Sequence, residues 1–205
     1  MKKFDTIIFD LDGVLVDSKI NMKKSWQKVK KKMKLNQSFN DYFNFIGYPF
    51  EKILEKIGIF HNISNIKRAY SQQSLNNIKF VKKYKDILKT IQILKKKKIK
   101  LAIVTSKDYV RAKKILKRLK IPIRVVICPK RNLNGKPSPD QILVALKKLN
   151  SIKKNTCYIG DMFVDYKTAK NAKINFIFAN YGYGKKKSIY NKIIRKPKDV
   201  LKFTA

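Results

Sequence analysis

The sequence predicts an α/β protein: a doubly wound, Rossmann-like parallel sheet with a helical domain inserted after its first strand. Three observations support this fold class. A short β-branched strand pattern opens the chain at residues 6–9. Helical patterns without a strand pattern follow it, and strand and helix patterns then alternate, which is typical of parallel sheets with helical crossovers. We therefore expect a core domain of residues 1–16 and 81–205, and an inserted helical domain of residues 17–80.

The first strand ends on two carboxylates. Its TIIF sequence is of the β-branched and aromatic type that forms buried strands, and it runs directly into Asp10 and Asp12. Side chains two positions apart on an extended chain point the same way, so both carboxylates can face one site, with Gly13 free to turn sharply behind them. The chain contains 13 acidic residues against 50 Lys and Arg, yet four of the acids fall between residues 5 and 17. This clustering favours a functional site over the plain turn that an isolated Asp-Gly pair predicts.

Residues 17–80 carry helical patterns interrupted by turn residues. Asp17 or Ser18 can cap the first helix, and the GYP sequence at residues 47–49 breaks the series. Trp26 and the neighbouring aromatic residues are expected in the core of this inserted domain. The expected helices span residues 19–34, 39–45, 50–57 and 63–75.

The rest of the chain alternates between helices and strands. Ser106 or Asp108 can cap the second of these helices. The expected helices span residues 84–97, 108–119, 140–149 and 164–172. The expected strands span residues 99–104, 123–127, 156–159 and 175–178. Right-handed crossovers between parallel strands bring all their carboxyl ends to one edge of the sheet.

Composition narrows the function classes. The formal net charge of +37 invites a nucleic-acid or acidic-membrane partner. The basic residues are overwhelmingly Lys, however, and they spread over nearly every expected helix, whereas base and phosphate recognition favours the Arg fork. We interpret the charge as a residue bias of solvent-facing surfaces, and expect no nucleic-acid or membrane partner and a monomer or dimer. The positive field should still favour anionic substrates.

The two cysteines, Cys128 and Cys157, are too few for a disulfide framework or a Cys-rich metal site. We expect them to be reduced thiols in the core. The basic start of the chain is not followed by an adequate apolar region, and no apolar run approaches membrane-spanning length. The expected location is the cytoplasm.

Several polar residues follow the strands at the common sheet edge, where doubly wound proteins bind their ligands. Carboxylates gathered there repel one another and are costly to desolvate without a cation, and an all-oxygen site suits Mg²⁺. Hydroxyl, backbone N–H and ammonium groups beside them would bind phosphoryl oxygens, so the combination favours phosphoryl transfer. The residues concerned are Asp10, Asp12, Thr105, Ser106, Lys136, Gly160, Asp161 and Asp165.

Four stretches resemble, in order and spacing, the four motifs of the haloacid dehalogenase-like hydrolase superfamily. They read FDLDGVLVDS, LAIVTSK, GKPSPD and IGDMFVD. The resemblance is to the subgroup of phosphoglycolate phosphatase-like and β-phosphoglucomutase-like proteins. It spans essentially the whole chain, including a helical cap domain inserted after the first motif. Any one motif is weak evidence, whereas all four in order are specific.

The resemblance implies a catalytic role for Asp10, Asp12 and Lys136, and phosphate binding by Thr105, Ser106 and Lys136. Asp10 would be the nucleophile that forms an aspartyl-phosphate. Asp12 would protonate the leaving oxygen and afterwards activate water. Thr105, with Ser106 beside it, would bind the phosphoryl group. Lys136 would neutralise charge on Asp10 and on the phosphoryl oxygens.

The resemblance also implies a Mg²⁺ cofactor. The ion would be held by Asp10, the backbone carbonyl of Asp12 and Asp161, with Asp165 behind them. The presence of Asp12 argues against a true dehalogenase, because dehalogenases resemble this pattern but lack the second Asp. The function implied is a Mg²⁺-dependent phosphatase for a small phosphorylated metabolite of the sugar phosphate or phosphoglycolate type.

Two alternatives remain open. A sugar phosphate mutase is the nearest: Phe50 falls where mutases tend to keep an arginine for the second phosphate, which favours hydrolysis, although Lys52 can substitute. A basic, non-catalytic polyanion-binding protein belongs to a different class and would have lost motif acids. In that protein Thr105 would merely cap a helix, Lys136 would be one lysine among many, and Asp165 would be a helix-terminal charge.

Overall fold

The computed structural model describes residues 3–204 of the chain. Within this range six strands form one parallel sheet in the order β5-β4-β1-β6-β7-β8. β1 (Thr6–Phe9) lies inside the sheet between β4 (Lys100–Val104) and β6 (Thr156–Gly160). The remaining strands are β5 (Val125–Ile127), β7 (Asn175–Ala179) and β8 (Ile193–Ile194). The expected α/β class with a Rossmann-like parallel sheet is confirmed.

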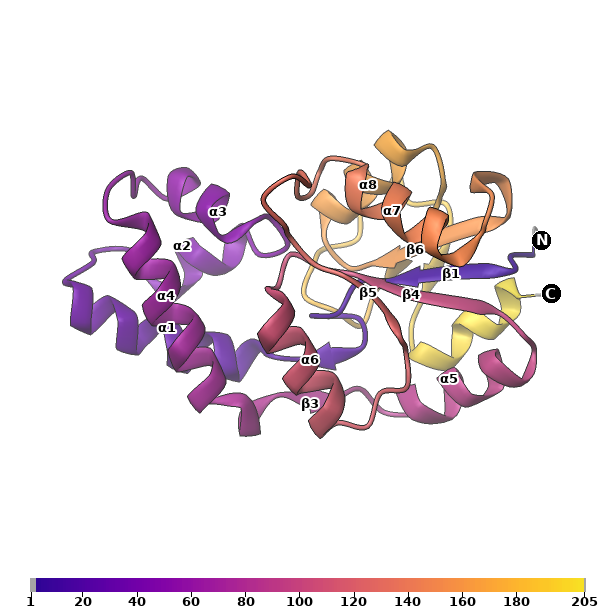
Figure 1. The fold of residues 1–205 in the computed structure, drawn as a ribbon, viewed down its shortest axis with the longest axis horizontal. Coiled ribbons are helices and arrows are strands. Elements are labelled where there is room, and N and C mark those ends of the chain that lie inside the picture. Colours follow the sequence, from indigo (N-terminus) through magenta and orange to yellow (C-terminus); the bar gives the residue numbers. More distant parts are fainter. Residues whose placement is uncertain (1–2, 205) are drawn as a thin grey trace.

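Helices cover both faces of this sheet (Figure 1). Strand side chains alternate between the faces. Ile7 and Phe9 therefore pack in one core with α5 and α6, while Ile8 packs in a second core with α7 and α8. The bounds are α5 (Ile87–Lys96), α6 (Tyr109–Arg118), α7 (Asp140–Leu149) and α8 (Phe163–Ala172), with the 3₁₀ helices η2 (Lys153–Asn155) and η3 (Pro197–Phe203).

The inserted segment forms a helical group on one side of the sheet, at the left of Figure 1. Its core is separate from those of the sheet and contains Trp26, whose ring stacks on Tyr42 with the centroids 4.7 Å apart. The division into domains at residues 17 and 80 stays a prediction. The helices are α1 (Lys19–Met33), α2 (Phe39–Asn44), α3 (Phe50–Lys56), α4 (Ile63–Asn76) and the 3₁₀ helix η1 (Ile78–Phe80).

A short antiparallel ribbon joins the inserted helices to the sheet. It pairs β2 (Val16–Asp17) with β3 (Lys82–Lys83). The expectation of helices without a strand from residue 17 to residue 80 was therefore wrong at Asp17, which is the last residue of β2. Two-residue strands such as β2, β3 and β8 are too short to show an alternating pattern.

Helix starts also differ in detail. α5 begins at Ile87, three residues after the predicted start, because Asp86 adopts a left-handed backbone with φ of 64°. Of the two candidate caps for α6, Asp108 is the cap: its carboxylate accepts the N–H of Arg111 at 2.9 Å. At α1, Asp17 accepts the N–H of Lys19 at 3.0 Å.

Both cysteines are buried free thiols, as expected. No helix between residues 3 and 204 combines the length and the apolar character that crossing a membrane requires.

Candidate active site

Three carboxylates meet at the carboxyl edge of the sheet. Asp10 follows β1, Asp161 follows β6, and Asp165 lies in the first turn of α8. One oxygen of each lies within 4.8 Å of the others, and all three residues are buried. The strand-end grouping predicted for these three acids is therefore present, with side chains converging on one point.

Lys136 links two of these acids. It lies in the loop between β5 and α7, and its Nζ is 2.9 Å from Asp10 Oδ1 and 2.7 Å from Asp165 Oδ1. Burial lowers the pKa of Lys136, but the two carboxylates more than offset this effect, so the net pKa is raised and the ammonium stays charged. Tyr158 on β6 supports the group, because its hydroxyl donates to Asp165 Oδ1 at 3.1 Å.

Asp10 is held between opposing influences. Burial is the largest of them and raises the pKa of Asp10, Lys136 lowers it, and the neighbouring Asp165 and Asp12 raise it. The net pKa is raised to about 7. A cation added beside Asp10 would favour the ionised form. The ionised form of this carboxylate therefore depends on positive charge in the site.

Asp161 has a buried carboxylate oxygen that a bound cation would neutralise. Its Oδ2 accepts the backbone N–H of Tyr183 at 2.6 Å, whereas its buried Oδ1 has no hydrogen-bond partner. Burial, followed by Asp165 and Asp10, raises its pKa well above the ordinary range. A buried carboxylate oxygen without a donor, beside two further carboxylates, fits the oxygen-ligand set of Mg²⁺.

The backbone around Asp161 leaves no room for other side chains. Gly13 adopts a φ of 84°, and a Cβ there would lie 2.2 Å from Asp161 Oδ2. Gly182 is equally close, because its Cβ would lie 2.3 Å from that of Asp161. The Asp-Gly turn after β1 thus serves both the backbone path and the placement of Asp161.

Asp165 occupies a different position from Asp161. Lys136 and Tyr158 contact its Oδ1, and the backbone N–H of Met162 donates to its Oδ2 at 3.0 Å. Both oxygens are already hydrogen-bonded, and the expected position of Asp165 behind the direct metal ligands stays a prediction.

The Asp12 side chain is not part of the cluster of three acids and contacts other groups. One of its oxygens accepts the Ser18 hydroxyl, and Oδ2 forms an ion pair with Lys107 Nζ at 3.1 Å. The side chain remains 14% exposed and borders the same cavity as Asp10. Its carboxyl group therefore borders the cavity and is not part of the acidic cluster.

Thr105 and Ser106 follow β4. Thr105 is buried at the cavity wall; its Oγ1 accepts the N–H of Lys107 at 3.2 Å, and Gln141 donates to its carbonyl at 3.1 Å. The Ser106 hydroxyl instead donates to the carbonyl of Gly47, at 2.6 Å, in the loop before α3. Ser106 thus joins the inserted helices to the sheet, and its predicted phosphate contact stays a prediction.

A small cavity of about 40 Å³ lies between the sheet edge and the inserted helices. Asp10, Asp12 and Thr105 border it from the sheet, and Phe50 borders it from α3. Lys52, considered as a substitute for a cap arginine, does not line the cavity; its side chain is 62% exposed and pairs with Glu55.

Sequence reasoning missed several residues of this site. Ser18 was considered only as a helix cap, and Tyr183 was not singled out. Lys107 stood inside a quoted motif, but nothing distinguished it from the other lysines. Arg111 and Tyr158 carried no signal beyond a helix and a strand pattern. Their importance comes from contacts between distant parts of the chain.

The chain belongs to the haloacid dehalogenase-like hydrolase family, whose model matches residues 7–179. It is 29% identical over 201 residues to a phosphoglycolate phosphatase of Aquifex aeolicus, covering 96% of this chain and 94% of that protein. It is 28% identical over 179 residues to the pyrophosphatase PpaX of Listeria welshimeri, covering 83% and 81%.

A solved structure shows the same fold. It is a haloacid dehalogenase-like family hydrolase from Streptococcus pneumoniae, with a TM-score of 0.85 at 23% sequence identity. The match covers 97% of each chain, so it includes the inserted helices as well as the sheet.

Proposed function

We propose that this protein is a Mg²⁺-dependent phosphatase that hydrolyses a small phosphorylated metabolite through an aspartyl-phosphate on Asp10. The observation that carries the proposal is the buried Asp10 carboxylate, 2.9 Å from Lys136 Nζ and grouped with Asp161 and Asp165. The relatives named above, a phosphoglycolate phosphatase and a pyrophosphatase, support phosphoryl hydrolysis.

In the first step, a carboxylate oxygen of Asp10 attacks phosphorus and the bond from phosphorus to the leaving oxygen breaks. Asp12 borders the same cavity and donates its proton to that leaving oxygen. Lys136 neutralises charge on Asp10, and Thr105 binds the phosphoryl group at the cavity wall. In the second step, Asp12 accepts a proton from water, the water oxygen bonds to phosphorus, and the bond to Asp10 breaks.

Asp10 and Asp161 would hold the Mg²⁺, together with the backbone carbonyl of Asp12. The metal supplies positive charge that offsets the repulsion between the Asp10 carboxylate and the phosphoryl oxygens. Lys136 and Tyr158 fix Asp165 behind these ligands. The unpaired Oδ1 of Asp161 is the feature of this chain that supports the assignment.

The inserted helices cover the cavity and would exclude water during the reaction. The cavity borders both the acidic cluster and the inserted helices, so the leaving group of the substrate would contact the inserted helices. Phe50 supplies no charge and Lys52 lies outside the cavity lining, which favours hydrolysis over mutase chemistry. Every motif acid is retained, which disfavours a non-catalytic binding protein.

Phosphate release from a panel of small phosphate esters, with and without Mg²⁺, tests the proposal. Metal-dependent release that Asp10→Asn abolishes would support it, and Asp5→Asn, a change to an exposed acid, should retain the activity. Folding of each variant is checked by circular dichroism. Absence of release from every ester by the folded wild-type protein would contradict the proposal.

A further inference from the structure

Three lysine or arginine side chains are buried in the part of the chain from residue 3 to residue 204. They are Lys107, Arg111 and Lys136. All three lie at the candidate active site, in a chain whose other described basic residues are at least partly exposed. Lys136 contacts Asp10 and Asp165, whereas Lys107 and Arg111 have no part in the phosphoryl chemistry proposed above. Burial of a cation is costly, so their presence requires an explanation.

Lys107 lies beside the proposed acid for the leaving group. Its side chain is 4% exposed, and its Nζ is 3.1 Å from Asp12 Oδ2. It follows the phosphate-binding candidate Thr105 by two residues and borders the same cavity. An ammonium group has more donor hydrogens than one carboxylate contact uses. Lys107 therefore places positive charge next to the position of the leaving oxygen.

Arg111 lies farther along α6, facing the inserted helices. Its Nε donates to the Asp108 carboxylate, and the guanidinium carbon is 5.3 Å from the centre of the Tyr70 ring. The side chain is 8% exposed and borders the cavity. Contact with a ring face and a carboxylate fixes the plane of the guanidinium, which pre-organises it for an anion.

The wall that the inserted helices give to the cavity is uncharged. It includes Tyr42 and Tyr70, whose hydroxyl groups are 3.0 Å apart. Burial raises the pKa of Tyr42 well above its ordinary value and that of Tyr70 to about 12, so both stay neutral. A negative charge on the leaving part of a substrate would therefore be recognised by Lys107 and Arg111.

We propose that Lys107 and Arg111 bind a second anionic group on the leaving part of the substrate. The site then selects small phosphate esters or anhydrides that carry a carboxylate or a second phosphate, since both groups accept charge-assisted hydrogen bonds from ammonium and guanidinium donors. This selectivity rests on the proposed phosphatase function, which places the transferred phosphoryl group at Asp10.

Three phosphonates test the second subsite. The phosphatase reaction proposed above does not cleave their P–C bonds. Ethylphosphonate carries a methyl group where phosphonoacetate carries a carboxylate and methylenediphosphonate a second phosphonate. Their binding to the wild-type protein in excess Mg²⁺ is measured by calorimetry. We expect one or both charged compounds to bind about 10- to 100-fold more tightly than ethylphosphonate. The preferred compound distinguishes a carboxylate from a phosphate ligand.

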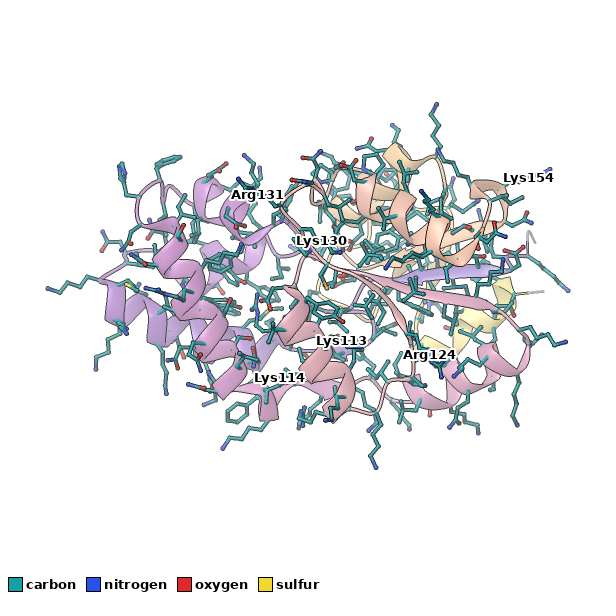
Figure 2. All side chains as sticks on the ribbon, in the orientation of Figure 1. Lys113, Lys114, Arg124, Lys130, Arg131 and Lys154 are labelled. Atoms are coloured by element: carbon teal, nitrogen blue, oxygen red, sulfur yellow. The ribbon has the colours of Figure 1, made fainter. Side chains whose placement is uncertain are left out.

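Variants then assign the preference. Arg111→Gln removes the charge but keeps a polar group beside Asp108, and should reduce the preference for the charged probes to within a few-fold. Arg111→Lys restores the charge and should recover part of it. Lys114→Gln removes an exposed charge from the same helix, where Figure 2 labels Lys113 and Lys114, and should keep the full preference.

Equal binding of all three phosphonates by the wild-type protein, or binding of none, would overturn the second subsite. So would an unchanged preference in Arg111→Gln, or an equal loss in Lys114→Gln, which would indicate the general positive field. Because none of the probes is turned over, failure of phosphate release would contradict the phosphatase function while leaving a measured anion preference intact.

Discussion

Lys136 Nζ lies 2.9 Å from Asp10 Oδ1, although the two residues are 126 positions apart in the chain. The contact is buried, and the same ammonium also reaches Asp165. It joins the loop after β5 to the ends of β1 and the start of α8. The proposed nucleophile is therefore held by charge at the point where three separate segments meet.

Removal of this ammonium should destabilise the protein. Lys136→Met leaves Asp10 and Asp165 buried without their cation, and we expect the free energy of unfolding to fall by about 3–5 kcal/mol. Lys130→Met, a change to an exposed lysine of the same loop that Figure 2 labels, should change it by less than about 0.5 kcal/mol. Urea denaturation measures both, and equal effects would show that the buried contact has no special weight.

Gly13→Ala should disrupt the site through Asp161. The new Cβ would lie 2.2 Å from Asp161 Oδ2, so the carboxylate must move and Mg²⁺-dependent phosphate release should be lost. Gly58→Ala is the matched control, because Gly58 also has a positive φ, of 78°, but no atom within 4 Å of the new Cβ. It should cost about 1–2 kcal/mol of stability and keep the activity. A Gly13→Ala protein as active as Gly58→Ala would disprove the tight placement of Asp161.

Mg²⁺ should stabilise the protein more strongly as the pH rises. In the metal-free protein the pKa of Asp10 is raised from 3.8 to about 7, so its contribution to stability is full below about pH 3.8 and is lost as the pH rises through about 7. Metal binding requires the ionised carboxylates and compensates for this loss. The increase in Tm on adding Mg²⁺ should therefore be larger at about pH 8 than at about pH 5.5.

Differential scanning fluorimetry measures this increase. Asp161→Asn should abolish the increase in Tm on adding Mg²⁺. Asp140→Asn, which changes the first residue of α7, should retain this increase. A Tm increase that is the same at both pH values would show that proton release from the clustered acids is not linked to metal binding.

Ser106→Ala should loosen the inserted helices from the sheet edge. The variant loses the hydrogen bond from the Ser106 hydroxyl to the carbonyl of Gly47, a contribution of about 1 kcal/mol, or about a fivefold change in a local opening equilibrium. Amide hydrogen exchange in residues 46–50 should accelerate by that factor, while exchange in β1 stays unchanged. Ser188→Ala, at an exposed serine, is the control. Unchanged exchange in residues 46–50 would show that the Ser106 hydrogen bond does not hold the inserted helices against the sheet edge.

The sequence allowed prediction of the sheet and of the residues at its edge. Apolar strand patterns predicted that Asp10, Asp161 and Thr105 each follow a strand. Parallel strands bring their carboxyl ends to one edge of the sheet, whatever the conformation of the loops. The contacts of Lys107, Arg111 and Ser18 could not be predicted in this way. Each depends on how a loop or helix lies against a distant segment, and Lys107 is one of many lysines. The ribbon of β2 and β3 was missed because strands of two residues show no periodicity.

A covalent phosphoryl group on Asp10 distinguishes the proposed mechanism from direct hydrolysis by water, and rapid acid quenching during turnover can trap it. Peptide mass spectrometry of the quenched protein should find a phosphoryl adduct on the peptide that contains Asp10. With acetyl phosphate, whose leaving group needs no proton, the adduct should accumulate in Asp12→Asn, which lacks the group that activates water, and it should be absent from Asp10→Asn. Steady phosphate release by the wild-type protein with no adduct on this peptide, or by Asp10→Asn at an undiminished rate, would contradict the account.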